Sequence, residues 1–251
     1  MKLLKAMAIA FSIYSKIPVP QFEWKEEDME YMMCFFPWIG GVIGMFFFGW
    51  AVLCEKFAVG NVCYALIGAA IPLMISGGFH VDGYMDTMDA FHSYQSREKK
   101  LEILKDSHIG AFAAIMLALY YMIDIAAISE IHTQKAVSAV AAVFFLARCF
   151  SGIAVMTLQP AKKEGLLYTF ASSAQKVRVK AALYFQAALC VAIMLLVSGW
   201  YGAAAIGAAL LSFFYFKKKS YKELGGITGD TAGFFVTVCE AAAVAVAGYF
   251  L

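Results

Sequence analysis

Three aspartates interrupt an otherwise apolar stretch, GGFHVDGYMDTMDAFHS, at residues 77–93. On a helix, Asp82, Asp86 and Asp89 fall within roughly 60° of one another, because each residue turns the helix by about 100°. Three like charges on one face repel each other, and folding does not require them. A divalent cation would relieve that repulsion, since hard cations take oxygen ligands. The spacing therefore predicts a magnesium site suited to phosphate chemistry, with an ordinary solvated helix face as the alternative.

Polar residues on either side of this segment extend the candidate site. His80 stands two residues before Asp82 and is either a satisfied packing residue or a ligand or base for the same chemistry. Asp106 and Ser107 precede an apolar stretch, so they either cap a helix or take part in the site. In the second case we expect Asp106 to be a further metal ligand or base, and Lys105 to contact phosphate.

A glycine-rich turn, GGITGDTAG at residues 225–233, leads into the last apolar segment. Asp230 could simply cap the helix that follows. The glycines beside Thr228, however, favour a loop whose amides point at an anion from a helix N-terminus. No Gly-Lys-Ser/Thr follows, so the turn is not a Walker loop. We predict that it forms part of the site.

The composition places these residues in a membrane protein. Hydrophobic residues make up 62% of the 251 residues and charged residues only 15%, and the mean hydropathy is +0.72. A soluble protein is about half apolar and about a quarter charged. The long apolar runs predict a single all-α domain over residues 1–251, a polytopic helical membrane protein with about seven transmembrane helices. Six or eight spans are the alternatives.

The predicted spans lie near residues 33–54, 61–79, 109–130, 136–158, 180–198, 201–216 and 231–251. The sixth has few residues, so it is either short or tilted. An apolar N-terminal run begins after Lys2 and ends at Pro18 and Pro20, with no small-residue cleavage site behind it. We expect a short helix in the membrane interface there, rather than a cleaved signal peptide.

Basic residues lie mostly on one side of these spans. The N-terminal region and residues 80–108, 159–180 and 217–230 hold 17 of the 20 Lys and Arg residues. All four segments would share one side of the membrane, and the positive-inside rule makes that side cytoplasmic. We therefore expect a multi-pass protein of the cell (inner) membrane whose active site faces the cytoplasm.

Three charged residues fall inside predicted spans, where ionised side chains are costly and usually paired or functional. Arg148 and Glu240 could form a structural ion pair, and we expect a structural role for Asp124 as well. The six cysteines show no Cys-x-x-Cys spacing, so neither a disulfide framework nor a zinc site is predicted.

Six blocks of the sequence resemble, in the same order, the cobalamin synthase family of adenosylcobinamide-GDP ribazoletransferases. They are FSIYSKIPVP, FFPWIGGVIG, GGFHVDGYMDTMDAFHS, SREKKLEILKDSHIGAFA, ARCFSGIAVMTLQPAKKEGL and GGITGDTAGFFVTVCE. The resemblance covers nearly the whole chain, which makes it more specific than one acidic motif. It implies a magnesium-dependent transfer late in vitamin B12 synthesis. In that reaction α-ribazole or its phosphate attacks adenosylcobinamide-GDP and releases GMP.

The resemblance also implies roles for the candidate residues. Asp82, Asp86 and Asp89 are expected to bind one or two Mg²⁺ ions on the pyrophosphate. Asp89 or His80 would accept the proton of the attacking hydroxyl. Arg148 would either stabilise charge near the leaving group or brace the spans. The other predicted contacts to phosphate and to the polar pocket come from Arg97, Lys105, Asp106, Ser107, Lys162, Lys163, Thr228 and Asp230.

Two other functions remain open at this point. Phosphotransferases of the CDP-alcohol type also place Asp-Gly ahead of spaced aspartates, but Ala-Arg normally follows, whereas Tyr-Met-Asp follows Asp82-Gly83 here. A cation transporter could use buried acids, but the sequence shows no symmetric broken helices. The predicted partners are the two substrates and the lipid bilayer, with no nucleic acid, and a homo-oligomer is a further alternative.

Overall fold

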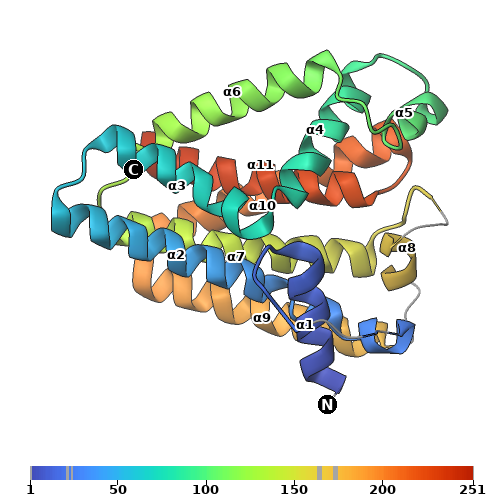
Figure 1. The fold of residues 1–251 in the computed structure, drawn as a ribbon, viewed down its shortest axis with the longest axis horizontal. Helices are drawn as coiled ribbons and strands as arrows, with labels where there is room; N and C mark the ends of the chain where they lie inside the picture. Colours follow the sequence, from blue (N-terminus) through green and yellow to red (C-terminus); the bar gives the residue numbers. More distant parts are fainter. Residues whose placement is uncertain (1, 21–22, 24, 163–165, 172–174, 251) are drawn as a thin grey trace.

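Helices make up nearly all of the fold (Figure 1). The computed structural model describes residues 2–20, 23, 25–162, 166–171 and 175–250. This part of the chain has no β-strand, and one isolated bridge joins Pro160 to Ile227. Its helices are α1 (Lys2–Tyr14), η1 (Glu26–Met29), η2 (Met32–Cys34), α2 (Phe36–Phe57), α3 (Asn61–Ser76), α4 (Phe79–His92), α5 (Arg97–Ile103), α6 (Ala111–Ile128), α7 (Gln134–Thr157), α8 (Leu166–Ala171), α9 (Lys176–Ser198), α10 (Trp200–Leu224) and α11 (Gly229–Tyr249). The all-α prediction is confirmed.

Helix α7 lies in the middle of the bundle and packs against α2, α9, α10 and α11. Two glycines of α2, four residues apart, bring it close to α7. A Cβ atom at Gly40 would lie 2.0 Å from the carbonyl oxygen of Phe144, and one at Gly44 would lie 2.2 Å from that of Ala141. Small residues at this spacing let membrane helices touch backbone to backbone, and such packing holds helices together in lipid.

Five segments among the described residues are long and apolar enough to cross a membrane. They are Met32–Phe57, Ala111–Ile128, Gln134–Thr157, Lys176–Ser198 and Gly229–Tyr249. Helices α3 and α4 together could make a sixth span, but they meet at an angle of 97°. The multi-pass architecture is confirmed, whereas the count of seven spans is not.

The two remaining predicted spans differ from expectation for local reasons. The span predicted at 61–79 breaks after Ser76, because Gly77 and Gly78 adopt φ values of 68° and 83° and turn the chain sharply. The span predicted at 201–216 is part of α10, whose apolar stretch is short because it continues into the Lys217–Lys219 run. The break between α3 and α4 was not anticipated, and it changes the direction of the helix that carries the aspartates.

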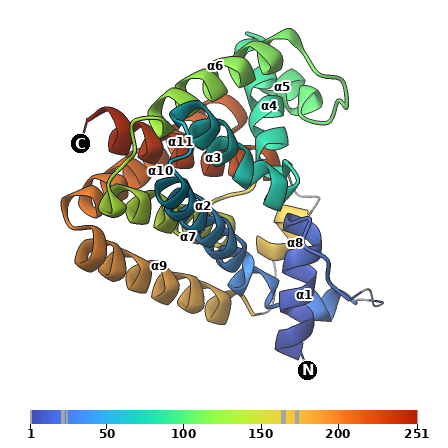
Figure 2. The same cartoon turned by 60° about the vertical axis from the view of Figure 1, so that its left-hand side comes forward.

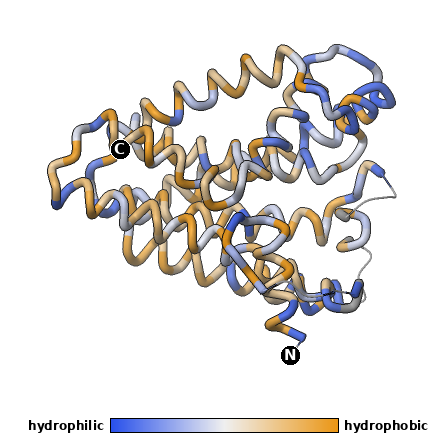
Figure 3. Tube along the Cα trace, in the orientation of Figure 1, coloured by the Kyte–Doolittle hydropathy of each residue, from blue (hydrophilic) through white to orange (hydrophobic). Residues whose placement is uncertain are grey.

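The polar connections gather at one end of the bundle. Helices α1, α5 and α8 lie at the end opposite the C-terminus in both ribbon views (Figures 1 and 2). Hydrophilic colouring is dense in the α4–α5 region at that end, while the long helices are mostly apolar (Figure 3). This arrangement matches the predicted separation of polar segments from spans.

Helix α1 has one buried face and one exposed apolar face. Ile9 and Tyr14 are buried and pack in the core, whereas Leu3 and Leu4 are exposed. Its core-facing side contacts α2 and both 3-10 helices. The N-terminal helix is therefore confirmed, and its position in the membrane interface stays a prediction. Tyr14 at its end lines a cavity between α1, α4, α7 and α11.

Candidate active site

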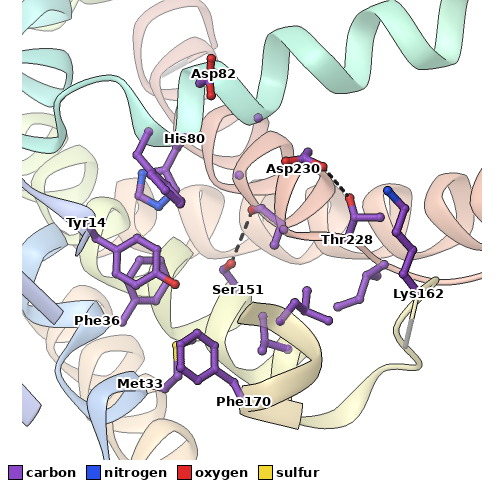
Figure 4. A pocket seen from close by; sticks show the side chains of 18 of the residues that line it. Tyr14, Met33, Phe36, His80, Asp82, Ser151, Lys162, Phe170, Thr228 and Asp230 are labelled. Atoms are coloured by element: carbon purple, nitrogen blue, oxygen red, sulfur yellow. Dashed lines mark hydrogen bonds between the residues drawn. The ribbon is translucent and has the colours of Figure 1, made fainter. Parts of the chain in front are cut away.

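A cavity of about 520 Å³ lies at the polar end of the bundle (Figure 4). Its walls come from α1, η2, α2, α4, α7, α8 and α11 and from the loops before α6, α8 and α11. Six residues of the predicted site line it: His80, Asp82, Lys105, Lys162, Thr228 and Asp230. Segments far apart in the sequence therefore meet here.

Glycines bring the aspartate helix directly against the start of α11. A Cβ atom at Gly83 would lie 2.8 Å from the carbonyl oxygen of Asp230, and one at Gly233 would lie 3.1 Å from that of His80. A side chain at Gly83 would force the two backbones apart, and one at Gly233 would require a smaller shift. This contact places Asp82 of α4 and Asp230 of α11 in the wall of one cavity.

The acidic side chains at this crossing repel one another. Asp82 is exposed in the cavity wall, while Asp86 is half-buried. The charges of Asp82, Asp230 and Asp89 act on Asp86, and that of Asp82 acts on Asp230. In the described part of the chain, no three His, Cys, Asp or Glu side chains are arranged to hold a metal ion by themselves. Mg²⁺ commonly needs only one or two carboxylates when substrate phosphates complete its shell.

Asp89 is engaged in a different interaction. Its Oδ2 accepts a hydrogen bond from the Gly110 amide at 2.7 Å, and its Oδ1 accepts one from the Ala113 amide at 2.8 Å. The carboxylate thus caps the N-terminus of α6 from another helix. A Cβ atom at Gly110 would lie 2.5 Å from Asp89 Oδ1, so a side chain there would displace the carboxylate. Asp89 does not line the cavity surface formed by Asp82 and Asp230.

Removal of this cap should destabilise the protein. We expect Asp89→Ala to cost about 0.5–2 kcal/mol, the range usual for loss of a helix cap. Asp89→Asn should cost less, because the amide oxygen still accepts one hydrogen bond. Unfolding of the purified protein by sodium dodecyl sulfate would measure both. Equal stability of all three proteins would contradict the capping role.

The start of α11 is built around Thr228. Its Oγ1 accepts a hydrogen bond from the Thr231 amide at 3.1 Å, and the Thr228 amide donates to Thr231 Oγ1 at 2.8 Å. Thr228, rather than Asp230, is therefore the N-cap of the last helix. The Thr228 hydroxyl also donates to Asp230 Oδ2 at 3.3 Å, which orients this carboxylate in the cavity wall (Figure 4).

Two backbone hydrogen bonds hold the loop after α7 against the loop before α11. The Ile227 amide donates to the Gln159 carbonyl at 3.0 Å, and the Ala161 amide donates to the Ile227 carbonyl at 2.8 Å. Lys162 follows directly, and its Nζ donates to the Leu101 carbonyl at 3.0 Å. Its charge also attracts Asp230. The predicted contact at Lys163 lies outside the described residues.

Three predicted residues lie near the site without lining the cavity. Asp106 accepts hydrogen bonds from the amide and from Nδ1 of His108, and these bonds lower the pKa of its carboxyl group. Ser107 is exposed. Neither residue caps α6, whose N-cap is Gly110, so the capping alternative for them is wrong. The Arg97 guanidinium lies beside Gly225, which has a φ of 71°.

His80 forms part of the aromatic wall of the cavity. It is only 5% exposed, and its ring lies 6.2 Å from that of Tyr14, 5.6 Å from that of Phe36 and 5.6 Å from that of Phe79. Figure 4 shows it beside Tyr14 and Phe36, on the opposite side from Thr228 and Lys162. His80 therefore lines the pocket, within its apolar half, and its role as a ligand or base stays a prediction.

Arg148 lies inside the bundle and makes an ion pair. Its Nη1 donates to Glu240 Oε1 at 2.6 Å and to the Phe144 carbonyl at 2.7 Å. Both charged side chains are buried, and Arg148 does not line the cavity. The predicted pairing of these two residues is confirmed, and the geometry favours the bracing role of Arg148.

The sequence pattern does not indicate the apolar half of the cavity. Aromatic and aliphatic side chains from six helical segments form it: Tyr14, Met33, Phe36, Phe79, Val155, Leu167 and Phe170. Ser151 of α7 lies between the two halves, and its hydroxyl donates to the Ala232 carbonyl at 3.4 Å. Periodicity does not distinguish such residues from ordinary core. Several of them do fall within the blocks that carry the family resemblance.

Comparisons with known proteins identify a family and several relatives. The model of the family described as Cobalamin-5-phosphate synthase matches residues 6–248. An adenosylcobinamide-GDP ribazoletransferase of Lachnoclostridium phytofermentans is 44% identical over 240 residues, covering 96% of this chain and 92% of that protein. Proteins of the same name from Clostridium botulinum and Azorhizobium caulinodans are 30% and 29% identical, over 95% and 96% of this chain and 94% of each relative. No solved structure matches the chain.

The residues matched by the family model include the whole cavity. Every residue that lines the cavity, from Tyr14 to Gly233, lies within the matched range of residues 6–248. The match also includes the crossing of α4 and α11 and the buried pair of Arg148 and Glu240. Together these findings show that the chain belongs to the cobalamin-5-phosphate synthase family.

Proposed function

We propose that this chain is an adenosylcobinamide-GDP ribazoletransferase and that the cavity beside α4, α7 and α11 is its active site. One observation carries the proposal: Asp82, Asp230, Lys105 and Lys162 come together in a single cavity. The reaction transfers the adenosylcobinamide phosphate group to α-ribazole or its phosphate and releases GMP, in the last steps of cobalamin assembly. The family and the names of its relatives support this function.

Cationic groups in the cavity suit a pyrophosphate. Lys105 and Lys162 line it, and the N-terminus of α11 begins at Gly229 in the same wall. Helix N-termini and ammonium groups both favour anions. In phosphoryl transfer, most of the rate enhancement comes from holding the reactants in line and from stabilising charge on the phosphoryl oxygens. We assign these tasks to the polar half of the cavity, which contains Asp82, Lys105, Lys162, Thr228 and Asp230.

We further propose that Asp82 and Asp230 hold Mg²⁺, with Asp86 close by. The mutual repulsion of these carboxylates supports a cation between α4 and α11. When bound, the ion would neutralise charge on the pyrophosphate oxygens. Asp89 already accepts two amide hydrogen bonds, and Asp106 is bonded to His108. Ligand roles for Asp89 and Asp106 therefore stay predictions.

The chemical step forms one bond to phosphorus and breaks another. A hydroxyl oxygen of ribazole attacks the phosphorus that carries the adenosylcobinamide group. The bond from this phosphorus to the bridging oxygen breaks, and GMP leaves with that oxygen. The hydroxyl proton passes to water or to a carboxylate of the cavity. The chain contributes mainly by binding and orienting the two anionic reactants.

We propose that the cavity opens toward the cytoplasm. The loops before α6 and α8, which contribute Lys105 and Lys162 to its wall, belong to the segments rich in Lys and Arg. The positive-inside rule then supports a cytoplasmic active site in a cell-membrane protein. A homo-oligomer stays a prediction.

An assay of the purified protein in lipid nanodiscs tests the proposed function. With adenosylcobinamide-GDP, ribazole phosphate and Mg²⁺, we expect one GMP for each corrinoid product. Chelation with EDTA should abolish the reaction, and added Mg²⁺ should restore it. GMP release without ribazole phosphate would indicate a hydrolase instead. Full turnover in EDTA would refute only the metal assignment.

The close contact at Gly83 should be required for turnover. Gly83→Ala places a methyl group against the Asp230 backbone, so α4 must move away from α11. Displacements of about 1 Å can cost roughly 100-fold in rate, and we expect a loss of that order. Gly49→Ala is the matched control, because a Cβ atom there meets nothing within 4 Å. Wild-type turnover by Gly83→Ala would show that this approach does not position the site.

A further inference from the structure

His80 is a buried polar side chain whose hydrogen-bonding groups are unused. It is 5% exposed, and neither ring nitrogen has a hydrogen-bond partner among the described residues. Buried polar side chains are nearly always hydrogen-bonded, and leaving one unsatisfied costs free energy. His80 lines the cavity, and protein atoms cover both of its nitrogens, so the ring must turn toward a bound molecule for that molecule to supply the missing partner.

The surroundings of this histidine are aromatic. The ring of Tyr14 is nearly parallel to that of His80, at 12°, while Phe79 meets it edge-on at 79°. Phe36 lies at 39° to it, and Phe170 also lines the cavity. Aromatic rings prefer such stacked and edge-to-face contacts with other rings. This wall therefore suits a flat, mostly apolar ring that carries one hydrogen-bonding group.

The two halves of the cavity differ in chemistry. Lys162, Thr228 and Asp230 lie together on one side in Figure 4, and His80, Tyr14 and Phe36 lie on the other. A molecule that fills both halves would have an anionic or hydroxylated end and an aromatic end. A nucleoside or nucleotide with an apolar base has this form.

We propose that the aromatic half binds the base of the acceptor nucleoside, and that a ring N–H of His80 donates a hydrogen bond to the free ring nitrogen of that base. The inference rests on the proposed function, in which the acceptor is ribazole. Ribazole carries a dimethylbenzimidazole base, which has one ring nitrogen free once the ribose is attached. That nitrogen accepts a hydrogen bond, and the rest of the base is apolar.

The other parts of the substrates fit this half less well. Guanine has several donors and acceptors along its edge, and few polar groups in an aromatic wall could satisfy them. A corrin ring is much larger than a nucleoside, whereas the cavity measures about 520 Å³, within the range of about 300–1,000 Å³ that is usual for small-molecule sites. The acceptor base is the part of either substrate that matches both size and polarity.

The test compares two acceptors that differ in one atom. In an indole analogue of ribazole phosphate, a C–H group replaces the free ring nitrogen. We expect wild-type protein to prefer the benzimidazole acceptor about tenfold in kcat/KM, the discrimination that one hydrogen bond worth about 1.4 kcal/mol provides. His80→Phe keeps an aromatic ring but removes both nitrogens. It should lose this preference and raise KM for ribazole phosphate, while KM for adenosylcobinamide-GDP stays unchanged.

His92→Phe is the matched control. His92 lies at the other end of α4, outside the cavity, with its Nδ1 2.8 Å from the Met88 carbonyl. It should keep the wild-type preference. Equal use of both acceptors by wild-type protein, or an unchanged preference in His80→Phe, would overturn the inference. A fall in kcat at saturating ribazole phosphate with no change in its KM would do so as well, since it would indicate a role in the chemical step.

A binding measurement separates this inference from the proposed function. In wild-type protein with ¹⁵N-labelled histidine, free dimethylbenzimidazole should shift the ring resonances of His80, and GMP should not. This measurement uses wild-type protein alone, so it depends neither on turnover nor on whether a variant folds. A protein that shows these shifts but no transfer with either acceptor would lack the proposed function yet keep the base site. Unshifted His80 resonances at saturating dimethylbenzimidazole would contradict the base site even if transfer is observed.

Discussion

Asp82→Asn and Asp230→Asn should each reduce transfer by at least about 100-fold while the protein still folds. Both side chains lie in the cavity wall, on helices that cross at Gly83. Asparagine keeps the size of the side chain but removes the charge that a magnesium ion and the pyrophosphate require. Loss of one electrostatic contact to a transition state typically costs about 100- to 1,000-fold in rate. GMP release at saturating substrates measures the effect.

A double variant tests whether the two aspartates bind the same ion. If Asp82 and Asp230 serve one ion, Asp82→Asn/Asp230→Asn should be hardly slower than the worse single variant, because residues that act as a unit are not additive. The single variants should also need more Mg²⁺ for half-maximal activity. Asp28→Asn is the control, since Asp28 pairs with Lys5 at the surface and lies outside the cavity. Multiplied losses in the double variant would indicate that the two aspartates act separately.

The buried ion pair should dominate stability. Removal of one partner, by Arg148→Met or Glu240→Leu, leaves an unpaired charge inside the bundle and should cost about 3–5 kcal/mol. Replacement of both partners removes both charges. In other proteins, replacement of a buried ion pair by apolar residues often leaves the free energy of unfolding unchanged or increases it. Unfolding in sodium dodecyl sulfate would measure all three variants. We expect the double variant to unfold near the wild-type concentration.

The activity of that double variant decides between the two roles considered for Arg148. The arginine is 1% exposed, bonded to Glu240 and to the Phe144 carbonyl, and absent from the cavity wall. A bracing role predicts that Arg148→Met/Glu240→Leu folds and retains transfer within about tenfold of wild type, a difference of about 1.4 kcal/mol. A stable double variant without transfer would show that Arg148 stabilises charge on the substrate.

Several features of the site could be predicted from the sequence because they depend on local composition. Apolar runs indicated membrane helices, and scarce charges inside them drew attention to Arg148 and Glu240. The spacing of three aspartates indicated a shared helix face, and α4 does carry all three. The glycine-rich turn before α11, which the sequence pattern singled out, lines the cavity.

Other features depend on contacts between distant segments, which periodicity does not encode. Asp89 shares a face with Asp82 in the sequence pattern, yet its carboxylate caps α6 because Gly110 packs against it. The turn at Gly77 and Gly78 redirects α4 and reduces the number of spans. The aromatic half of the cavity combines residues from α1 to α8 whose types are common in any membrane helix. Only the packed structure separates them from ordinary core.

Chemical blocking of the cavity shows whether the cavity is the active site. Gly229 lines the cavity, and a Cβ atom there meets nothing within 4 Å, so Gly229→Cys should fold and remain active. Gly60, in the loop before α3 and away from the cavity, is equally open and gives the control Gly60→Cys. Both would be made in a background with Cys34 and Cys63 replaced by serine, because the other cysteines are buried.

Each variant is then treated with a bulky maleimide, and transfer is measured once labelling is complete. The account predicts that labelled Gly229→Cys loses transfer, that labelled Gly60→Cys keeps it, and that adenosylcobinamide-GDP with Mg²⁺ slows labelling only at Gly229→Cys. Full transfer by completely labelled Gly229→Cys would contradict the assignment of this cavity as the active site.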